Sequence, residues 1–188
     1  TVLGGIGNDL LYGSDGDDSL SGGNSQDTLY GGNGEDNVSG GSGNDLIYGE
    51  WSESGSPAGN DTLQGNSGDD TILGGLGNES VVGGSGSDVL GGGMGVDTLT
   101  GNSGGDFFYY GNTTQSGIGA GNRDIIADFG GSDKIDISAF AVLGTTQWAT
   151  TDEGGNTIVA IDVNGDATAE FEIELVGVHT LEAGDFVI

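Results

Sequence analysis

The chain has 188 residues, and its 30 acidic against 2 basic side chains give a formal net charge of −28. It contains 43 glycines and no cysteine, so disulfides and thiol chemistry are excluded, and no apolar run is long enough to span a bilayer. The acidic balance also disfavours nucleic acid as a partner, because phosphate recognition requires basic side chains.

A nine-residue phrase, Gly-Gly-x-Gly-x-Asp-x-(Leu/Ile/Val/Phe)-x, recurs from Gly4 to Tyr109. Such a fixed period predicts a solenoid. Ten units have nine residues and the sixth has sixteen; the units begin at Gly4, Gly13, Gly22, Gly31, Gly40, Gly49, Gly65, Gly74, Gly83, Gly92 and Gly101. The alternative is an acidic, glycine-rich disordered tail, but the apolar residues at the eighth position stay in phase, which favours a fold.

Each unit combines a turn with a short strand. The glycines allow tight turns with inward carbonyls, and the sixth position adds a carboxylate, a donor set that suits calcium better than magnesium or zinc. The sixth-position acids are Asp9, Asp18, Asp27, Asp36, Asp45, Asp61, Asp70, Glu79, Asp88, Asp97 and Asp106. The last three positions predict a strand whose middle residue points inward. The predicted core is Leu11, Leu20, Leu29, Val38, Ile47, Leu63, Ile72, Val81, Leu90, Leu99 and Phe108.

In these motifs the sequence resembles the RTX repeat family. The resemblance implies an all-β fold, a right-handed parallel β-roll in which two units make one coil and Ca²⁺ lies between loops of units two apart. It also implies the ligands: carbonyls at positions two and four with the acid of one loop, and carbonyls at positions one and three with the acid of the next. For the first pair these are Gly5, Gly7, Asp9, Gly22, Asn24 and Asp27.

Odd and even units place their loops on opposite edges of such a roll. The further ligands implied on the odd edge are Gly23, Ser25, Gly40, Ser42, Asp45, Gly41, Gly43, Gly65, Ser67, Asp70, Asn66, Gly68, Gly83, Ser85, Asp88, Gly84, Gly86, Gly101, Ser103 and Asp106. Those on the even edge are Ser14, Gly16, Asp18, Gly31, Asn33, Asp36, Asp61, Gly74, Glu79, Gly92 and Asp97.

We expect roughly six to nine bound Ca²⁺ ions in total. Departures from the motif fall mostly on the even edge, where Glu79 lengthens one ligand and the insertion at about 50–58 distorts a loop, so we expect weaker or empty sites there. Ser25, at a fourth position, keeps its carbonyl and loses only the conformational freedom of glycine.

The period fails after residue 110, which predicts a roll over 1–110 and a non-repetitive, β-sandwich-like cap over 111–188. The cap segments Arg123–Phe129 and Asp133–Ser138 resemble the region after the repeats in serralysin-type metalloproteases and other type I secreted proteins. This resemblance makes Asp124, Asp128 and Asp133 candidate ligands of a closing calcium ion. The alternative is that they are surface acids at strand ends.

Two features of the cap have local interpretations. Strands at about 156–163 and 169–176 flank Asn164-Gly165-Asp166, which favours a β-hairpin. The acids from Asp162 onward also imitate the start of an EF-hand loop, but the twelfth position is Ile173, where that loop requires a bidentate Glu. The end of the chain, Gly184–Ile188, resembles the terminal element of type I secretion signals, and its simpler interpretation is a final strand that packs on the cap.

Outward-facing positions differ between the two predicted sheets. Tyr12, Tyr30 and Tyr48 recur every eighteen residues and should stack on successive coils about 4.8 Å apart. With Leu10, Leu46 and Trp51 they form a candidate docking face for an upstream domain, a partner chain or a polysaccharide. The alternative is cross-strand packing that stabilises an exposed sheet.

The sequence offers no catalytic constellation, because the single histidine, His179, has no cysteine partner and no His-Glu-x-x-His motif occurs. We therefore expect a non-enzymatic calcium module, secreted through a type I exporter, that folds outside the cell at the C-terminus of a larger protein such as a hydrolase. Thr1 lies within a few residues of the first repeat, which is why an upstream domain is expected. The alternatives are a polysaccharide-binding module, as in alginate epimerases, and a structural segment of an adhesin or surface layer.

Overall fold

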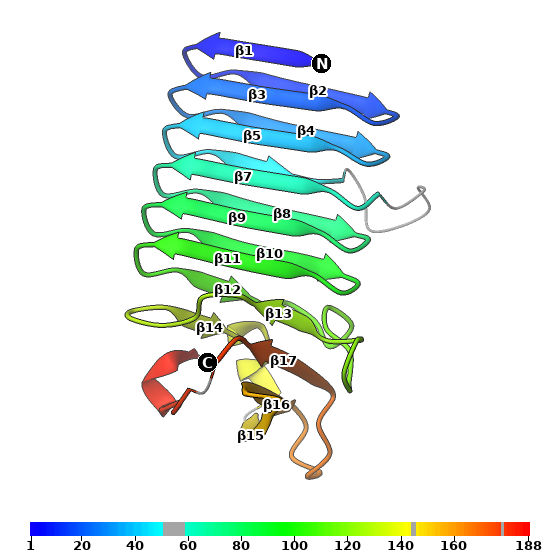
Figure 1. The fold of residues 1–188 in the computed structure, drawn as a ribbon, viewed down its shortest axis with the longest axis vertical. Coiled ribbons are helices and arrows are strands. Elements are labelled where there is room, and N and C mark those ends of the chain that lie inside the picture. The colour runs from blue at the N-terminus through cyan, green and yellow to red at the C-terminus, as the bar shows by residue number, and fades with distance from the viewer. Residues whose placement is uncertain (51–58, 144–145, 178) are drawn as a thin grey trace.

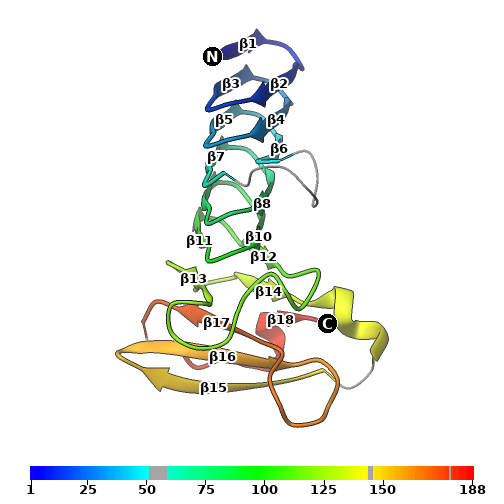
Figure 2. The ribbon, with the colours of Figure 1, turned by 90° about the vertical axis from the view of Figure 1, so that its right-hand side faces the viewer.

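A computed structural model describes residues 1–50, 59–143, 146–177 and 179–188. Two parallel sheets face one another in a stack of flattened coils, and the C-terminal part of the chain closes one end of the stack (Figures 1 and 2). In the roll, one sheet contains β1 (Val2–Ile6), β3 (Ser19–Asn24), β5 (Asn37–Ser42), β7 (Thr62–Ser67), β9 (Ser80–Ser85) and β11 (Thr98–Ser103). The other contains β2 (Leu10–Asp15), β4 (Thr28–Asn33), β6 (Leu46–Tyr48), β8 (Thr71–Leu76), β10 (Val89–Met94) and β12 (Phe107–Tyr109).

Equivalent positions of the repeat stack directly on one another. Leu11 pairs with Leu29, eighteen residues on, and across the sixteen-residue unit Ile47 pairs with Ile72 without loss of register. All eleven predicted core residues are buried, none more than 7% exposed. The predicted β-roll and its core are therefore confirmed.

Most strands are longer than the three residues that the sequence predicts. β3, for example, continues from Ser19 through the first three positions of the next unit to Asn24. Glycine and asparagine have low strand propensity, but Gly23 pairs with Gly41 and Asn24 with Ser42 on the next coil, and this repeated pairing overrides the local preference. The chain also adds β1 before the first full strand, where Val2 pairs with Leu20.

The cap continues both sheets of the roll. β13 (Asp124–Ile126) pairs with β11, and β17 (Phe171–Leu175), β16 (Asn156–Asp162) and β15 (Gln147–Glu153) follow in order. In the other sheet β14 (Lys134–Asp136) pairs with β12, and β18 (Phe186–Val187) is the last strand. Two 3-10 helices, η1 (Ser138–Leu143) and η2 (Ala183–Asp185), complete the cap. Both sheets and one hydrophobic core cross residue 110, so the cap is an extension of the roll.

The last strand is formed as the sequence predicts. In β18, Phe186 pairs with Ile135 of β14 and stacks on Trp148 of β15 with ring centroids 4.6 Å apart. This strand joins the end of the chain to the sheet that runs through the roll.

The expected hairpin is present with a longer connection. β16 and β17 are antiparallel, and Ile161 pairs with Phe171 across residues 163–170. The carboxylate of Asp162 accepts hydrogen bonds from the backbone N–H groups of Asn164, Gly165 and Ala167 at 2.6–3.1 Å, which replaces a two-residue turn by a loop organised around one side chain. Neither 3-10 helix, nor any other helical stretch of the described chain, could cross a membrane.

Candidate metal sites along the edges of the roll

The repeat acids form two columns, one along each edge of the roll. On the odd edge, Oδ1 of Asp27 accepts a hydrogen bond from the backbone N–H of Asp9 at 2.8 Å, and the same bond recurs up to Asp106. On the even edge, Oδ1 of Asp36 accepts from the N–H of Asp18, also at 2.8 Å. One oxygen of each of these carboxylates is thereby fixed by the neighbouring coil.

The second oxygen of most of these acids is buried and has no hydrogen-bond partner among the described residues. This holds for Oδ2 of Asp9, Asp27, Asp36, Asp45, Asp61, Asp70, Asp88, Asp97, Asp106 and Asp124, and for both oxygens of Glu79. Burying a charged oxygen without a partner is costly, and desolvation accordingly raises the pKa of Asp61 and Asp70 to about 7 and that of Asp88 to about 6.

Carbonyl oxygens lie close to the unpartnered carboxylate oxygens. A Cβ added at Gly4 would lie 2.6 Å from Oδ2 of Asp9 and 2.5 Å from the carbonyl oxygen of Gly22. Similarly, a Cβ at Gly23 would collide with the carbonyl oxygen of Gly5, and one at Gly43 with that of Ser25. Glycine is therefore favoured where the oxygens gather, and a set of carboxylate and carbonyl oxygens in a loop fits a Ca²⁺ ion.

Non-glycine residues in the loops adopt the glycine conformation. Ser14, Asn66 and Asn102 at second positions have φ of 86°, 78° and 68°, and Ser25 at a fourth position has φ of 80°. Ser25 therefore keeps its carbonyl in the loop as expected, at the cost of a left-handed backbone.

The three cap acids are not brought together as one closing site. Asp124 extends the even column, since its Oδ1 accepts the N–H of Asp97 at 2.9 Å, and Asp133 extends the odd column by accepting the N–H of Asp106 at 3.1 Å. Asp128 is exposed, and its two oxygens accept the N–H groups of Gly101 and Asn102. The three acids could not be separated from the sequence because the cap has no period to assign them to an edge.

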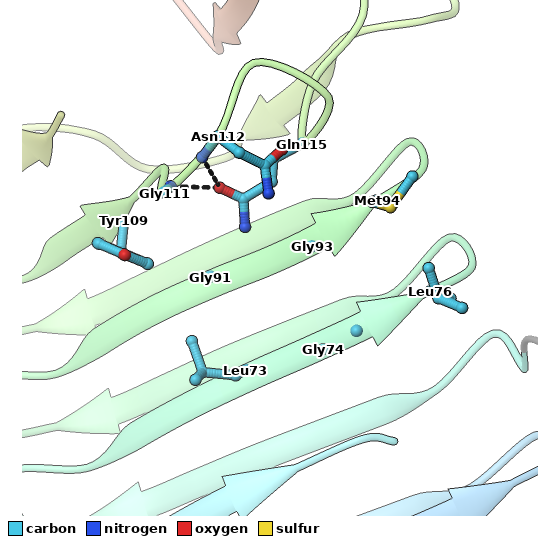
Figure 3. A pocket seen from close by; sticks show the side chains of 11 residues that line it. Leu73, Gly74, Leu76, Gly91, Gly93, Met94, Tyr109, Gly111, Asn112 and Gln115 are labelled. Carbon is cyan, nitrogen blue, oxygen red and sulfur yellow. Dashed lines mark hydrogen bonds between the residues drawn. The ribbon is translucent and has the colours of Figure 1, made fainter. Parts of the chain in front are cut away.

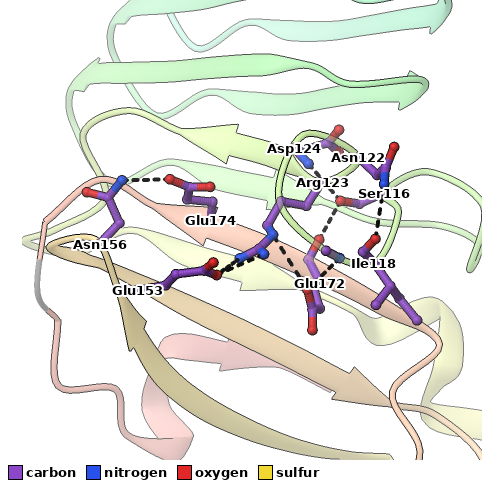
Figure 4. Close-up of polar contacts among 10 residues, drawn as sticks. Ser116, Ile118, Asn122, Arg123, Asp124, Glu153, Asn156, Glu172 and Glu174 are labelled. Atoms are coloured by element: carbon purple, nitrogen blue, oxygen red, sulfur yellow. Dashed lines mark hydrogen bonds and ion pairs between the residues drawn. The ribbon is translucent and has the colours of Figure 1, made fainter.

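A polar cluster holds the cap end of the even column (Figure 4). Arg123 is only 4% exposed; its guanidinium donates two hydrogen bonds to Glu153 at 3.0 Å and lies 3.5 Å from Glu172. Next to it, Oγ of Ser116 accepts the backbone N–H of Asp124 at 2.8 Å. Burial, with the nearby charge of Asp97, raises the pKa of Asp124 to about 8.

The tyrosines of the candidate docking face stack as predicted. The rings of Tyr12 and Tyr30 are 5.1 Å apart and those of Tyr30 and Tyr48 are 4.9 Å apart, inclined by 11° and 6°. Tyr30 thus has a ring against each of its faces, a geometry that favours cross-strand packing over stacking of a sugar on this ring. Leu10 is 58% exposed and Leu46 is half-buried beside the column, whereas Trp51 lies outside the described residues.

On the same sheet a groove of about 330 Å³ opens where Gly91 interrupts the outward side chains (Figure 3). Leu73 and Tyr109 flank it, and Met94 and Gln115 also line it. Apart from the tyrosine phenol, its described lining carries no titratable side chain.

His179 lies elsewhere, half-buried, with its ring edge-on to Phe129 and its Nε2 at 2.8 Å from the Val176 carbonyl oxygen.

Two further acidic features were not predicted from the sequence. Oxygens of Asp162, Asp166 and Glu170 lie within 4.8 Å of one another, but those of Asp162 and Glu170 accept backbone N–H groups of their own loop. Glu50, treated as part of a distorting insertion, is buried in the even edge. The signal that could have identified it is its place, an acid directly after the first glycine of the sixteen-residue unit.

Comparison with protein-family models agrees with the repeat pattern. The family model of the RTX calcium-binding nonapeptide repeat, which spans four copies, matches residues 3–38, 30–52, 58–90 and 73–108. Among solved structures, the AlgE6R3 subunit of the Azotobacter vinelandii mannuronan C5-epimerase is 26% identical with a TM-score of 0.45, covering 93% of this chain and 80% of that chain. The AlgE6R2 subunit of the same epimerase is 28% identical with a TM-score of 0.39, covering 68% and 87%. No curated protein sequence matches the chain.

Proposed function

The chain belongs to the family of RTX calcium-binding nonapeptide repeat proteins, and from this premise we propose that it is a module that folds when it binds Ca²⁺ outside the cell. It serves the folding and secretion of a larger exported protein, a hydrolase that carries the module at its C-terminus. Its partners are the upstream domain of that protein and a type I exporter, and the chain itself has no catalytic role.

The observation that carries this proposal is the row of buried carboxylate oxygens without hydrogen-bond partners. On a chain with a net charge of −28, these acids repel one another and lose their hydration when the coils stack. Bound calcium supplies positive charge and a partner for these oxygens. Since the loops acquire their geometry only in the stacked coils, ion binding and folding are coupled.

Secretion is supported by the place of the terminal segment. β18 pairs with β14, and β14 is held by the strands of the roll, so the end of the chain is built into a sheet once the coils form. Calcium is scarce in the cytosol, and there the unfolded chain leaves this segment accessible to an exporter. Folding outside the cell then builds the segment into the sheet, so that the exporter can no longer bind it and the chain cannot move back through the exporter.

The test is a calcium titration of the whole chain followed by far-ultraviolet circular dichroism, with magnesium as the control. We expect a cooperative transition from coil to β structure at about 0.1 to 1 mM Ca²⁺, the range of extracellular modules, and no transition with Mg²⁺. A chain already folded in chelator at neutral pH would contradict calcium-driven folding.

A polysaccharide-binding module is the second proposal, supported by the groove between Leu73 and Tyr109 on the same sheet as the tyrosine column. Calcium-dependent retention on an alginate or agar column supports this function, and elution with the void volume argues against it. A structural role in an adhesin or surface layer requires calcium-dependent self-assembly, which sedimentation measures directly.

A further inference from the structure

The sixteen-residue unit places an additional carboxylate in the even edge. Glu50 occupies the second position of this unit and is 8% exposed. β6 ends at Tyr48, and its pairing with β8 stops at Leu73, whereas β10 pairs with β8 as far as Leu76. Beyond Gly49, whose backbone N–H donates to the carbonyl oxygen of Leu73, no described strand continues this pairing with β8.

The carboxylate of Glu50 takes the place of a main-chain carbonyl. In the regular coils, a Cβ at the second-position glycine would collide with the second-position carbonyl oxygen of the preceding coil, as at Gly93 with the oxygen of Gly75. A Cβ at Gly75 would instead meet Oε2 of Glu50, at 2.6 Å. The backbone N–H of Leu76 donates to the same Oε2, and that of Gly59 donates to Oε1 at 3.2 Å.

Other predicted ligand atoms surround the same space. A Cβ at Gly49 would lie 2.5 Å from Oδ2 of Asp61 and would also collide with the carbonyl oxygen of Gly74. A Cβ at Gly77 would collide with Oε1 of Glu79 and with the carbonyl oxygen of Gly59. The space between these two loops is thus lined by three acids, where a regular pair of loops supplies two.

Two of these acids point to a ligand independently of their clustering. Glu79 is 2% exposed and neither of its oxygens has a partner among the described residues, and Asp61 is 1% exposed with Oδ2 unpartnered. Burial raises the pKa of Glu50, Asp61 and Glu79, and repulsion from neighbouring acids adds to this effect, chiefly from Asp36 for Glu50 and Asp61 and from Asp97 for Glu79. The oxygens of the three acids do not all lie within 4.8 Å of one another, so binding one shared ion would require these side chains to move closer together.

We propose that Glu50, Asp61 and Glu79 form a three-carboxylate calcium site in which the insertion supplies a side-chain oxygen in place of a main-chain carbonyl. The insertion and the longer Glu79 complement one another, and this site binds Ca²⁺ at least as tightly as the regular sites, because affinity rises with the number of charged ligands. This conclusion replaces the expectation that the even edge is weak or empty at these units. It rests on the proposed calcium-binding function.

The test compares Glu50→Gln with Glu35→Gln in the full chain. Both substitutions remove one negative charge from the even edge, but Glu35 is exposed on the neighbouring loop. Calorimetric titration with Ca²⁺, after circular dichroism has verified folding, should show that E50Q loses one ion or that one site weakens by about tenfold or more. E35Q should match the unaltered chain. If E50Q retains every site at unchanged affinity, Glu50 only replaces a backbone acceptor, and the proposal is wrong.

A second measurement decides the matter if E50Q fails to fold. Crystals of the unaltered chain grown with Ca²⁺ should give an anomalous peak between Glu50, Asp61 and Glu79, and the absence of this peak beside peaks at the regular loops would overturn the site. If the unaltered chain binds no calcium at all, the proposed function itself fails. The two failures are therefore distinguishable.

Discussion

At the scale of single residues, the two oxygens of most repeat aspartates have different surroundings. In Asp88, Oδ1 accepts the N–H of Asp70 at 2.8 Å and orders the coils, whereas Oδ2 is buried without a partner in the described chain. Asparagine keeps an acceptor for the first role and replaces the second oxygen with an NH₂ group, which cannot bind a cation. An Asp→Asn substitution therefore separates ion binding from the ladder, by which we mean the row of hydrogen bonds from backbone N–H groups to Oδ1 atoms of the next coil.

We predict that Asp88→Asn raises the calcium midpoint of folding by about threefold or more, because a charged ligand is lost while the ladder bond is retained. Asp69→Asn is the matched control. Asp69 is exposed, next to Asp70 on the preceding coil, and it also accepts a backbone N–H, from Ser87 at 2.8 Å. Its midpoint should be unchanged. Titrations monitored by circular dichroism measure both, and equal midpoints for the two variants would remove Asp88 from the ligand set.

The loop glycines differ in how closely the next coil approaches them. Gly43 and Gly7 both have positive φ, 127° and 103°, but a Cβ at Gly43 would collide with the carbonyl oxygen of Ser25, whereas one at Gly7 meets nothing within 4 Å. Alanine at either position strains the backbone by roughly 1 kcal/mol or more. We predict a clearly larger loss of stability for Gly43→Ala, measured by urea unfolding in saturating calcium, and a higher calcium midpoint of folding, measured by circular dichroism titration. Equal losses would mean that backbone strain alone requires these glycines.

At the scale of elements, the repeat made the core predictable and the edges only partly so. All eleven inward residues could be assigned because the eighth position is apolar in every unit, but strand length could not, because pairing between coils rather than propensity extends each strand. Asp124 and Asp133 resemble one cluster in sequence and lie on opposite edges, since the turn between them carries the chain from one sheet to the other. Glu50 was missed because the second position of every other unit is glycine, serine or asparagine, so an acid at this position was counted with the insertion that follows it.

The cap depends on Arg123, which links β13 to β15 and β17. Its guanidinium is buried, whereas its partner Glu153 is 58% exposed. When the arginine is removed, water can partly solvate the glutamate carboxylate that is left without its partner, which limits the loss of stability. We predict that Arg123→Met lowers the stability of the calcium-loaded chain by about 2 kcal/mol, seen as a lower Tm. Glu153→Gln should cost less than half of this. A Tm for Arg123→Met equal to that of the unaltered chain would show that apolar packing alone holds the cap.

At the scale of the whole molecule, the two acid columns run from the first coil into the cap, so charge repulsion is distributed along the entire stack. Burial raises the pKa of Asp61 and Asp70 to about 7 and of Asp124 to about 8, above the ordinary value of 3.8. In the unfolded chain these acids titrate near the ordinary value. Between about pH 4 and pH 8 the calcium-free fold therefore binds more protons than the unfolded chain, and its free energy of unfolding falls as pH rises.

It follows that protons partly replace calcium in stabilising the roll. We predict that the calcium-stripped chain has more β structure at pH 5 than at pH 8, with the change spread over the interval in which these acids titrate, measured by circular dichroism after removal of divalent ions. Because the sequence pI is about 4.1, sedimentation at both pH values must show the same monomer, so that association is not mistaken for folding. A chain equally unstructured at both pH values would mean that neutralising the acids is insufficient. Folding would then require the geometry that an ion with several oxygen ligands imposes on the loops, and not merely the loss of their charge.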